Sequence, residues 1–439
     1  MSDTFNTPSR RDFVALGSVA TAATMLSAGG VYAGGKDDVI KVGLIGCGGR
    51  GSQAAENCMD ADKGVKLWAV GDAFKEKAAG LVERKKGSKK YSGRTEVTED
   101  RIFGGLDAYQ KVIDSGVDLV ILATTPGFRP YHLEAAIKAG KHVFCEKPVA
   151  TDAPGIRKVL SLVDEAKKKN LAVVAGTQRR HQQGYIDTVK AVHDGAIGEL
   201  VGGRCYWNGT EPWFHARNDK DFLKLAGHET ELAYQINNWY HFTWLCGDHI
   251  TEQHVHNLDV INWLMQSHPI AASGMGGRSH RRVGDPKDVG NIFDHFAVEY
   301  EYPNGARVFS FCRHAPGCDQ NVSEAVIGTK GRADLQDSAR YQINGKTVGK
   351  DKDISPYVQE HVDLIRSIRE NKPLNELQNV AESTMTAILG RMSTYTGHRI
   401  TWADALASKQ QLMPEPKDMS WDMKIETPPV AIPGKTKFV

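Results

Sequence analysis

A lysine follows directly on a short apolar run, at the position where a strand would end. The run spans residues 142–145, and Glu146, Lys147 and Pro148 come immediately after it. In an open α/β sheet, ligands bind beyond the carboxyl ends of the strands. The proline also restricts the backbone just past the lysine. We therefore expect Lys147 to act in catalysis or to orient a substrate.

A second group of residues suited to proton transfer lies between positions 247 and 264. If this segment is one helix, it carries His249, Glu252, His256, Asp259 and Trp263 on one face. Glu252 and His256 are then close enough for the carboxylate to orient the imidazole. An imidazole with an ordinary pKa near 6.5 suits acid–base work. A metal site and a purely structural polar helix remain open alternatives. Because the segment lacks HExxH spacing, we expect no metal.

A glycine-rich loop between an apolar strand and a helix predicts a dinucleotide site. The loop consists of Gly46, Cys47, Gly48, Gly49, Arg50 and Gly51. Its glycines let the backbone approach a pyrophosphate, and the helix N-terminus supplies amide donors. Asp72 ends the next strand and can accept hydrogen bonds from a ribose diol, which favours NAD. NADP remains possible because Lys75 and a basic loop are nearby, and a plain glycine turn is the structural alternative.

The order of elements predicts an α/β protein with two domains. Apolar strands and amphipathic helices alternate from residue 38 to about 160, which is typical of a doubly wound parallel Rossmann sheet. We assign residues 161–400 to an α/β domain for substrate binding and oligomerisation. Its longer strand segments after about residue 195 predict an open, mainly antiparallel sheet. Residues 401–439 are rich in proline and are expected to form an extended tail.

The first 33 residues resemble an export signal. Arg10 and Arg11 precede a mildly apolar stretch, and Ala33 offers a cleavage point. We expect export to the periplasm by the twin-arginine pathway, with a disordered N-terminus as the alternative. The apolar stretch is too short for stable membrane insertion. A net charge of +2 gives no reason to expect nucleic acid as a partner.

Taken together, these motifs resemble those of the Gfo/Idh/MocA oxidoreductase family. The shared motifs are the glycine loop, Thr124-Thr125-Pro126, the residues 139–143 and Glu146-Lys147-Pro148. The resemblance implies that the threonines and the proline border the cofactor. Glu146 is expected to hold a cofactor ribose or to pair with Lys147. It also implies that His256 is the acid/base, on a helix with the pattern Asp-x-x-x-His-x-x-Asp. Glu252 then takes the place of the first aspartate.

The sequence departs from the family pattern in two places. Glutamate at position 252 lengthens the carboxylate arm by one methylene. The loop from Pro126 to His132 is longer than usual and borders the nicotinamide side. Arg180 and His181 follow another strand end, where the family places substrate contacts. We expect His241 to line the same pocket.

The resemblance implies an NAD(P)-dependent dehydrogenase acting on a CH–OH group of a sugar or polyol. A homo-oligomer, dimer or tetramer, is expected. Exported proteins lack access to free NAD, so a second hypothesis is redox-assisted glycoside cleavage with tightly bound NAD. A third is a non-catalytic protein that binds nicotinamide or sugar.

Overall fold

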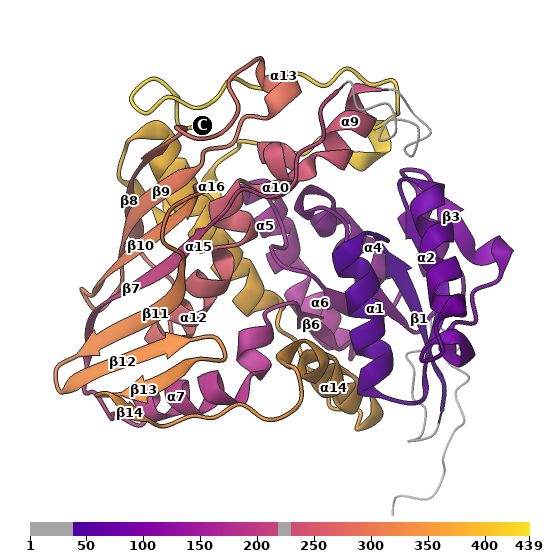
Figure 1. Ribbon diagram of the computed structural model, residues 1–439, viewed down its shortest axis with the longest axis horizontal. Coiled ribbons are helices and arrows are strands. Elements are labelled where there is room, and N and C mark those ends of the chain that lie inside the picture. The colour runs from indigo at the N-terminus through magenta and orange to yellow at the C-terminus, as the bar shows by residue number, and fades with distance from the viewer. Residues whose placement is uncertain (1–37, 218–229) are drawn as a thin grey trace, which may run out of the picture. The chain divides into compact units, whose positions relative to one another are not determined.

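The first of two sheets is parallel and six-stranded (Figure 1). The structure is a computed structural model that describes residues 38–217 and 230–439. The strand order is β3-β2-β1-β4-β5-β6. The strands are Ile40–Ile45 (β1), Val65–Asp72 (β2), Ile102–Gly104 (β3), Leu119–Leu122 (β4), His142–Cys145 (β5) and Val173–Ala175 (β6). The order reverses between β1 and β4, where such sheets bind dinucleotides. The predicted doubly wound sheet is confirmed.

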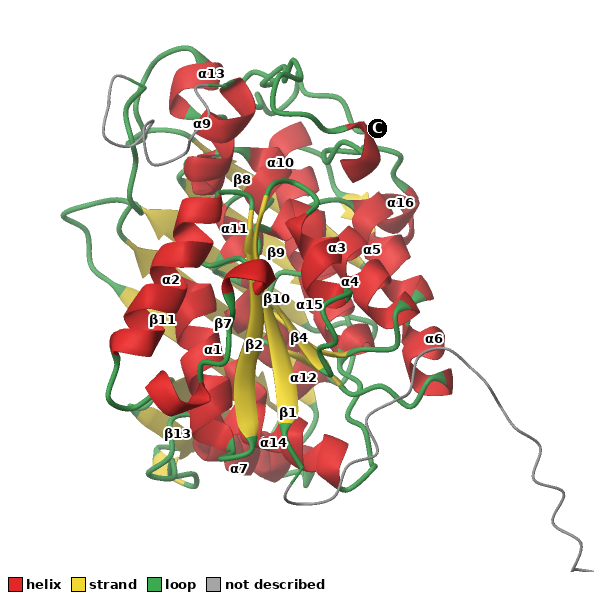
Figure 2. Cartoon of the chain, turned by 90° about the vertical axis from the view of Figure 1, so that its right-hand side faces the viewer, coloured by secondary structure: helices red, strands yellow, loops and turns green. Residues whose placement is uncertain are grey.

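Helices cover both faces of this sheet (Figure 2). They are Gly49–Ala61 (α1), Lys75–Gly87 (α2), Ala108–Ile113 (α3), Arg129–Lys138 (α4), Ala153–Ser161 (α5) and Val163–Lys168 (α6). Far along the chain, Pro356–Arg369 (α14) packs Leu364, Ile365 and Ile368 into the core of this sheet. The sheet itself continues past residue 160 to β6.

The glycine loop between β1 and α1 needs glycine at two positions for steric reasons. Gly46 has a φ of +96°, and a Cβ there would lie 2.6 Å from the carbonyl group of Ala123. A Cβ at Gly51 would lie 1.9 Å from the Gly46 oxygen. By contrast, Cβ positions at Gly48 and Gly49 meet no atom within 4 Å. These two residues therefore face open space, as a loop that holds a pyrophosphate requires.

The second sheet has nine strands in the order β14-β13-β12-β11-β7-β10-β9-β8-β15. Neighbouring strands in this sheet are antiparallel, except that β7 and β10 are parallel. The strands are Leu200–Gly209 (β7), Ala271–Gly277 (β8), His295–Glu301 (β9), Arg307–His314 (β10), Asn321–Gly328 (β11), Gly331–Gln336 (β12), Arg340–Ile343 (β13), Lys346–Thr347 (β14) and Ile400–Thr401 (β15). The predicted open, mainly antiparallel sheet is confirmed.

Helices of the second half pack against this sheet and join it to the first. The α-helices are Gln183–His193 (α7), Glu231–Asn237 (α9), Thr243–Cys246 (α10), His249–Glu252 (α11), Val255–Met265 (α12), Pro286–Val289 (α13), Leu377–Thr396 (α15) and Trp402–Ala407 (α16). Short 3₁₀ helices include Pro126–Phe128 (η3), Gln178–His181 (η4), Trp239–His241 (η5) and Pro416–Asp418 (η6). The long helix α15 is almost entirely buried.

The helix expected to run from His249 to Trp263 is interrupted. α11 ends at Glu252 and α12 begins at Val255. Between them, the buried His254 places Nε2 2.7 Å from the Ser310 hydroxyl of β10. The prediction of a single continuous face was therefore wrong, because the backbone N–H of His254 donates to the His249 oxygen five residues back and that of His256 to the Gln253 oxygen three residues back.

The C-terminal tail crosses back over the first half of the chain. After α16 it runs mostly without regular structure past α13 and α9 (Figure 1). The backbone N–H of Leu412 donates to Asp152 Oδ2 at 2.7 Å, and Trp421 packs its ring 5.5 Å from that of Phe74. Across residues 38–217 and 230–439, no helix combines the length and apolarity needed to cross a membrane. Residues 1–33, which carry the expected export signal, lie outside the described residues.

The glycine loop leads to a stability prediction. Gly51→Ala should destabilise the nucleotide-free protein by about 2 kcal/mol or more, because its Cβ overlaps the Gly46 carbonyl oxygen. Gly49→Ala is the matched control and should leave the unfolding midpoint unchanged or slightly higher, since its Cβ enters open space. Thermal unfolding followed by circular dichroism measures both. Equal midpoints for the two variants would contradict this account of the loop.

Candidate active site

Lys147 and Glu252 meet where the two halves of the chain come together. Lys147 follows β5, and its Nζ donates to the Glu252 backbone oxygen at 2.5 Å and to Glu252 Oε1 at 3.3 Å. Each side chain is only 12% exposed. The carboxylate predicted to orient His256 is thus paired with the lysine. The end of β5 and the end of α11 form one charged, mostly buried centre.

His256 lies one turn further on, in α12, with an uncharged imidazole. Its ring stacks on Trp207 of β7, with centroids 5.8 Å apart. Burial holds its pKa well below the ordinary value, and the positive charges of Lys147 and Arg179 lower it further. Among the residues that the structure describes, none hydrogen-bonds its ring nitrogens. A neutral imidazole beside Lys147 is suited to accept a proton.

A buried cluster of polar side chains anchors the start of α12. Glu324 of β11 accepts hydrogen bonds from Arg179 Nη1 and Asn257 Nδ2, both at 2.5 Å, and from the Tyr185 hydroxyl at 3.1 Å. Asn257 is the neighbour of His256 in sequence. The second sheet therefore fixes where the imidazole is presented.

Arg129 ties together the loops that follow β4 and β5. Its Nη2 donates to the Thr124 backbone oxygen at 2.7 Å, and its Nη1 donates to the Pro148 oxygen at 2.5 Å. The guanidinium is buried, and burial lowers its pKa. This residue lies in the stretch that the sequence marked as unusually long. Its role there is to hold the loop of Lys147 in place.

The glycine loop reaches the same region through Arg50. Arg50 Nε lies 2.5 Å from Glu146 Oε1, and its Nη2 lies 3.1 Å from Glu360 Oε1 in α14. The guanidinium also packs over the Tyr357 ring. Glu146, expected to bind a cofactor ribose or pair with Lys147, is therefore paired with the arginine of the glycine loop.

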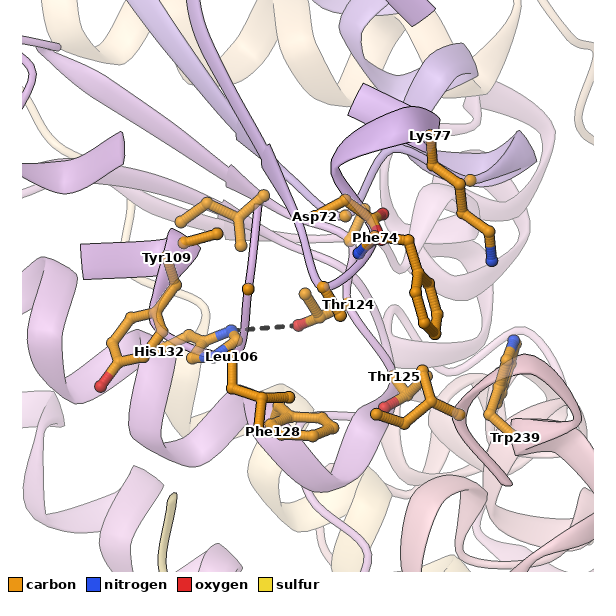
Figure 3. A pocket seen from close by; sticks show the side chains of 18 residues that line it. Asp72, Phe74, Lys77, Leu106, Tyr109, Thr124, Thr125, Phe128, His132 and Trp239 are labelled. Carbon is orange, nitrogen blue, oxygen red and sulfur yellow. Dashed lines mark hydrogen bonds between the residues drawn. The ribbon is translucent and has the colours of Figure 1, made fainter. Parts of the chain in front are cut away.

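A pocket opens at the switch point of the first sheet (Figure 3). Among its lining residues are Gly46, Gly48, Asp72, Phe74, Lys77, Leu106, Tyr109, Thr124, Thr125, Phe128, His132, Ile236 and Trp239. The His132 ring stacks on Tyr109 at 4.2 Å, and its Nδ1 lies 3.2 Å from the Thr124 hydroxyl. Ile236 and Trp239 come from α9 and η5. The second half of the chain thus supplies one wall.

The polar groups of this pocket fit NAD. Asp72 Oδ2 accepts the backbone N–H of Cys47 at 2.7 Å, and Oδ1 accepts that of Phe74 at 3.0 Å. Each oxygen keeps a second lone pair, so the carboxylate can still accept from a ribose diol. Thr125 has a buried hydroxyl without a hydrogen-bond partner in the described part of the chain. Together with the open space at Gly48, these groups would hold the ribose and phosphates of the cofactor.

The other predicted site residues have their side chains engaged elsewhere. Arg180 forms a two-pronged ion pair with Asp259 of α12, at distances of 2.9–3.0 Å. His181 lies between Asp363 and Glu376, and although burial lowers its pKa, these two carboxylates raise it to about 10. Pro126 begins η3 on the first-half side of the pocket. Arg180 and His181 thus join helices to the end of β6.

His241 belongs to a buried network on the far side of Glu252. Arg281 Nη1 lies 3.3 Å from His241 Nδ1, and Arg281 Nη2 lies 2.9 Å from His314 Nδ1. Burial lowers the pKa of His241 to about 3. His314 Nε2 in turn lies 2.9 Å from the side-chain oxygen of Gln253. Residues 38–217 and 230–439 contain no cluster of three or more His, Cys, Asp or Glu side chains that could hold a metal ion.

Several residues of this region were missed by sequence reasoning. They are Arg129, Trp207, Tyr240, Arg281, His314 and the pair formed by Lys77 and Asn237, whose side chains lie 2.6 Å apart. The unusual length of the Pro126–His132 loop was a signal for Arg129. The others reach the site from segments with no recognisable motif.

Comparison with known proteins agrees with this geometry. Residues 40–176 match the oxidoreductase family with an NAD-binding Rossmann fold, and residues 185–334 match the GFO/IDH/MocA C-terminal domain. The chain belongs to the Gfo/Idh/MocA oxidoreductase family. The resemblance noted in the sequence is confirmed, as is the NAD-binding Rossmann fold that it implied.

Individual relatives extend over most of the chain. The inositol 2-dehydrogenase of Azotobacter vinelandii is 27% identical over 345 residues, which cover 75% of this chain and 86% of that protein. The inositol 2-dehydrogenase of Serratia proteamaculans is 26% identical, and the match covers 69% of this chain and 76% of that protein. Two solved structures share the fold. They are scyllo-inositol dehydrogenase from Lactobacillus casei with NAD(H) and scyllo-inositol (TM-score 0.61, 19% identity, 83% of this chain and 100% of that chain) and aldose-aldose oxidoreductase from Caulobacter crescentus (TM-score 0.62, 17% identity, 83% and 99%).

Neutral buried histidines lead to a prediction about stability and pH. Burial lowers the pKa of His132 to about 3, whereas an imidazole in an unfolded chain titrates near 6.5. The unfolded chain therefore binds a proton below pH 6.5 that the folded protein excludes. The free energy of unfolding is intact above pH 6.5 and falls as the pH drops towards 3. His132→Phe should remove about 1.4 kcal/mol per pH unit from that slope, as measured by urea unfolding between about pH 5 and 8.

His181 serves as a control of opposite sign. Because its pKa is raised to about 10 in the folded protein, its stabilisation is fully present below pH 6.5 and is lost as the pH rises towards 10. His181→Gln should therefore flatten the alkaline side of the profile and leave the acidic slope unchanged. An acidic slope in His132→Phe as steep as that of the wild type would show that this histidine does not contribute to it.

Proposed function

We propose that this protein is an NAD-dependent dehydrogenase that oxidises a secondary hydroxyl of a sugar or polyol. The observation that carries the proposal is the ion pair of Lys147 and Glu252 after β5, near enough to His256 for the charge of Lys147 to lower the pKa of its imidazole. Membership of an oxidoreductase family and similarity to inositol 2-dehydrogenases support the reaction class. The sugar or polyol itself stays a proposal.

Each of the three residues has a distinct part in the proposed reaction. NAD, when bound, supplies the acceptor for the hydride that leaves the substrate carbon. Lys147 Nζ donates a hydrogen bond to the reacting oxygen and stabilises the charge that develops there. His256, held neutral by burial, accepts the hydroxyl proton. Glu252 positions the ammonium group of Lys147, to which it is already paired, and accepts a hydrogen bond from a neighbouring substrate hydroxyl.

Lys147→Met tests the proposal in a screen of sugars and polyols. Wild type should produce NADH with at least one substrate, and the variant should lose roughly 100-fold or more in kcat because the developing charge lacks its donor. NAD binding, followed by calorimetry, should be largely retained. Lys138→Met is the control, because Lys138 forms an exposed pair with Glu134 in α4. Equal turnover by Lys147→Met would contradict the assignment.

A specific observation favours a second candidate, in which the cofactor is retained. Phe74 and Phe128 line the cofactor pocket and share an apolar cluster with Met413, Trp421 and other residues of the tail. The tail is also held by Asp152, by Gln235 on α9 and by Asn291. The C-terminal tail therefore packs against two side chains that line the pocket. A cofactor that leaves slowly suits redox-neutral chemistry.

In this second candidate, oxidation of the substrate is transient. The hydroxyl becomes a carbonyl, the neighbouring C–H becomes acidic, and a glycosidic substituent leaves by elimination. Water then adds, and the hydride returns to the carbonyl carbon, so the net reaction is hydrolysis. NADH accumulation during the screen supports a dehydrogenase that exchanges its cofactor. When glycosides are added to the screen, cleavage of a glycoside without NADH supports the second candidate, and the absence of both signals would leave a binding protein.

Substitution in the tail tests cofactor retention directly. Trp421→Ala should speed the release of bound NAD by roughly tenfold, because it removes the aromatic contact with Phe74. Trp402→Ala is the matched control, since Trp402 also stacks on a ring, that of His268, but lies outside the apolar cluster of Phe74 and Phe128. Nucleotide remaining after timed dialysis, measured by absorbance, gives the two rates. Equal rates would show that the tail plays no part in retention.

We further propose that the chain is exported through its twin-arginine segment. Mass spectrometry should show that protein recovered from the periplasm begins at residue 34. An intact Met1 would contradict export.

We also propose that the chain assembles into a homo-oligomer. The outer face of the second sheet supports assembly, because Met275, Phe309 and Phe311 are at least 36% exposed and Phe311 stacks on Tyr206. Light scattering should give a molar mass greater than that of one chain. A monomer would contradict assembly.

A further inference from the structure

Asp248 adopts a backbone conformation that residues with a side chain rarely take. Its φ is +71° and its ψ is 162°, a combination found almost only in glycine. The side chain is also fully buried. An aspartate is less stable than glycine in this conformation, so its carboxylate must supply something that glycine lacks. Residues held in such conformations cluster at functional sites.

The carboxylate of Asp248 joins three separate segments of the chain. Its Oδ1 accepts from the backbone N–H of His249 at 2.6 Å and, since a carboxylate only accepts, from the ring Nδ1 of the same residue at 3.0 Å. Its Oδ2 accepts from the backbone N–H of Phe293 at 2.8 Å and from the Tyr395 hydroxyl at 2.5 Å. Burial opposes ionisation, yet these hydrogen bonds lower the pKa of Asp248 below its ordinary value. Asp248 thus connects the start of α11 to α15 and to the segment before β9.

The helix α11 depends on such an anchor because it is only one turn long. It runs from His249 to Glu252, and a single turn is not stable on its own. The backbone N–H of Glu252 closes this turn by donating to the Asp248 oxygen at 2.9 Å. The oxygen of the preceding residue, Gly247, accepts from Arg391 at 2.9 Å. The first end of α11 is therefore fixed by its contacts with the rest of the chain.

The other end of α11 meets the lysine of the candidate active site. Lys147 Nζ donates to the Glu252 backbone oxygen at 2.5 Å and to Glu252 Oε1 at 3.3 Å. Both acceptors belong to the residue whose N–H is bonded to Asp248. A shift of this turn would therefore move both acceptors away from the ammonium group together.

We infer that Asp248 is a positioning residue, which sets α11 so that Glu252 holds the Lys147 ammonium group where the reaction needs it. Asp248 is buried and acts through Glu252. The inference rests on the proposed oxidation, in which Lys147 stabilises charge on the reacting oxygen. Displacement of a catalytic group by about 1 Å can lower a rate by about 100-fold. The carboxylate at this unfavourable backbone position is thereby explained.

Labelling of lysine amines tests the position of Lys147 without any turnover. Asp248→Asn replaces one acceptor oxygen by an amide that only donates, so the hydrogen bonds to that oxygen are lost. An acetylating reagent should then modify Lys147 about fivefold faster than in wild type, which is the factor that the loss of one hydrogen bond gives. Mass spectrometry of peptides measures the rate. Lys85, which is buried and paired with Glu56, is the internal control and should react equally in both proteins.

Kinetics separate positioning from general damage to the fold. With a substrate that wild type oxidises, Asp248→Asn should lower kcat by roughly tenfold or more and change KM little. In a Lys147→Met background, the same substitution should lower kcat by no more than about twofold, because the group that it positions is already absent. Asp334→Asn is the matched control, since it replaces another buried carboxylate, one paired with Arg332 in β12, and should leave kcat unchanged.

A second variant serves if Asp248→Asn fails to fold. Asp248→Gly suits the positive φ and removes the carboxylate, so it should show the same changes in labelling and in kcat. Unchanged labelling of Lys147, or equal losses of kcat with and without Lys147, would overturn the inference and leave the proposed oxidation intact. If wild type oxidises no sugar or polyol, the proposed oxidation fails, and the labelling still decides whether Asp248 positions Lys147.

Discussion

The contact between Lys147 and Glu252 is the constraint on which the rest of the structure depends. A mostly buried ammonium group is stable only if acceptors meet it with good geometry. Its acceptors come from α11, in the half of the chain that builds the second sheet. The two halves must therefore meet in one relative position. Arg391 of α15 stabilises this position, because its buried guanidinium donates to the backbone oxygens of both Thr151 and Gly247.

The charged groups around this centre are paired, so few of them can change their protonation state. Arg179 and Arg180 are each paired with a buried carboxylate, and Arg50 bridges two. Burial keeps His256 neutral, as it does His132 and His241. Few residues here can therefore change their charge when a substrate binds. A site of this kind favours one protonation state before the substrate arrives, which lowers the reorganisation needed during reaction.

Much of the first domain could be predicted from the sequence because its signals are local. The strand at residues 142–145, the glycine loop and Asp72 follow from apolar runs and spacing that neighbouring residues determine. The pairing of Glu252 with Lys147 could not be predicted, since the two lie 105 positions apart. The same is true of Arg50 and Glu360, which are 310 positions apart. The contact between His254, where the predicted helix is interrupted, and Ser310 on another strand could not be predicted for the same reason.

The C-terminal tail has a consequence for the order in which the molecule is completed. The Rossmann strands are synthesised first, and the segment that contains Met413 and Trp421 leaves the ribosome last. Until then, Phe74 and Phe128 lack their partners in the apolar cluster beside the pocket. Two side chains that line the nucleotide pocket therefore gain these packing partners only when the chain is finished. The support behind that part of the pocket depends on the segment that is synthesised last.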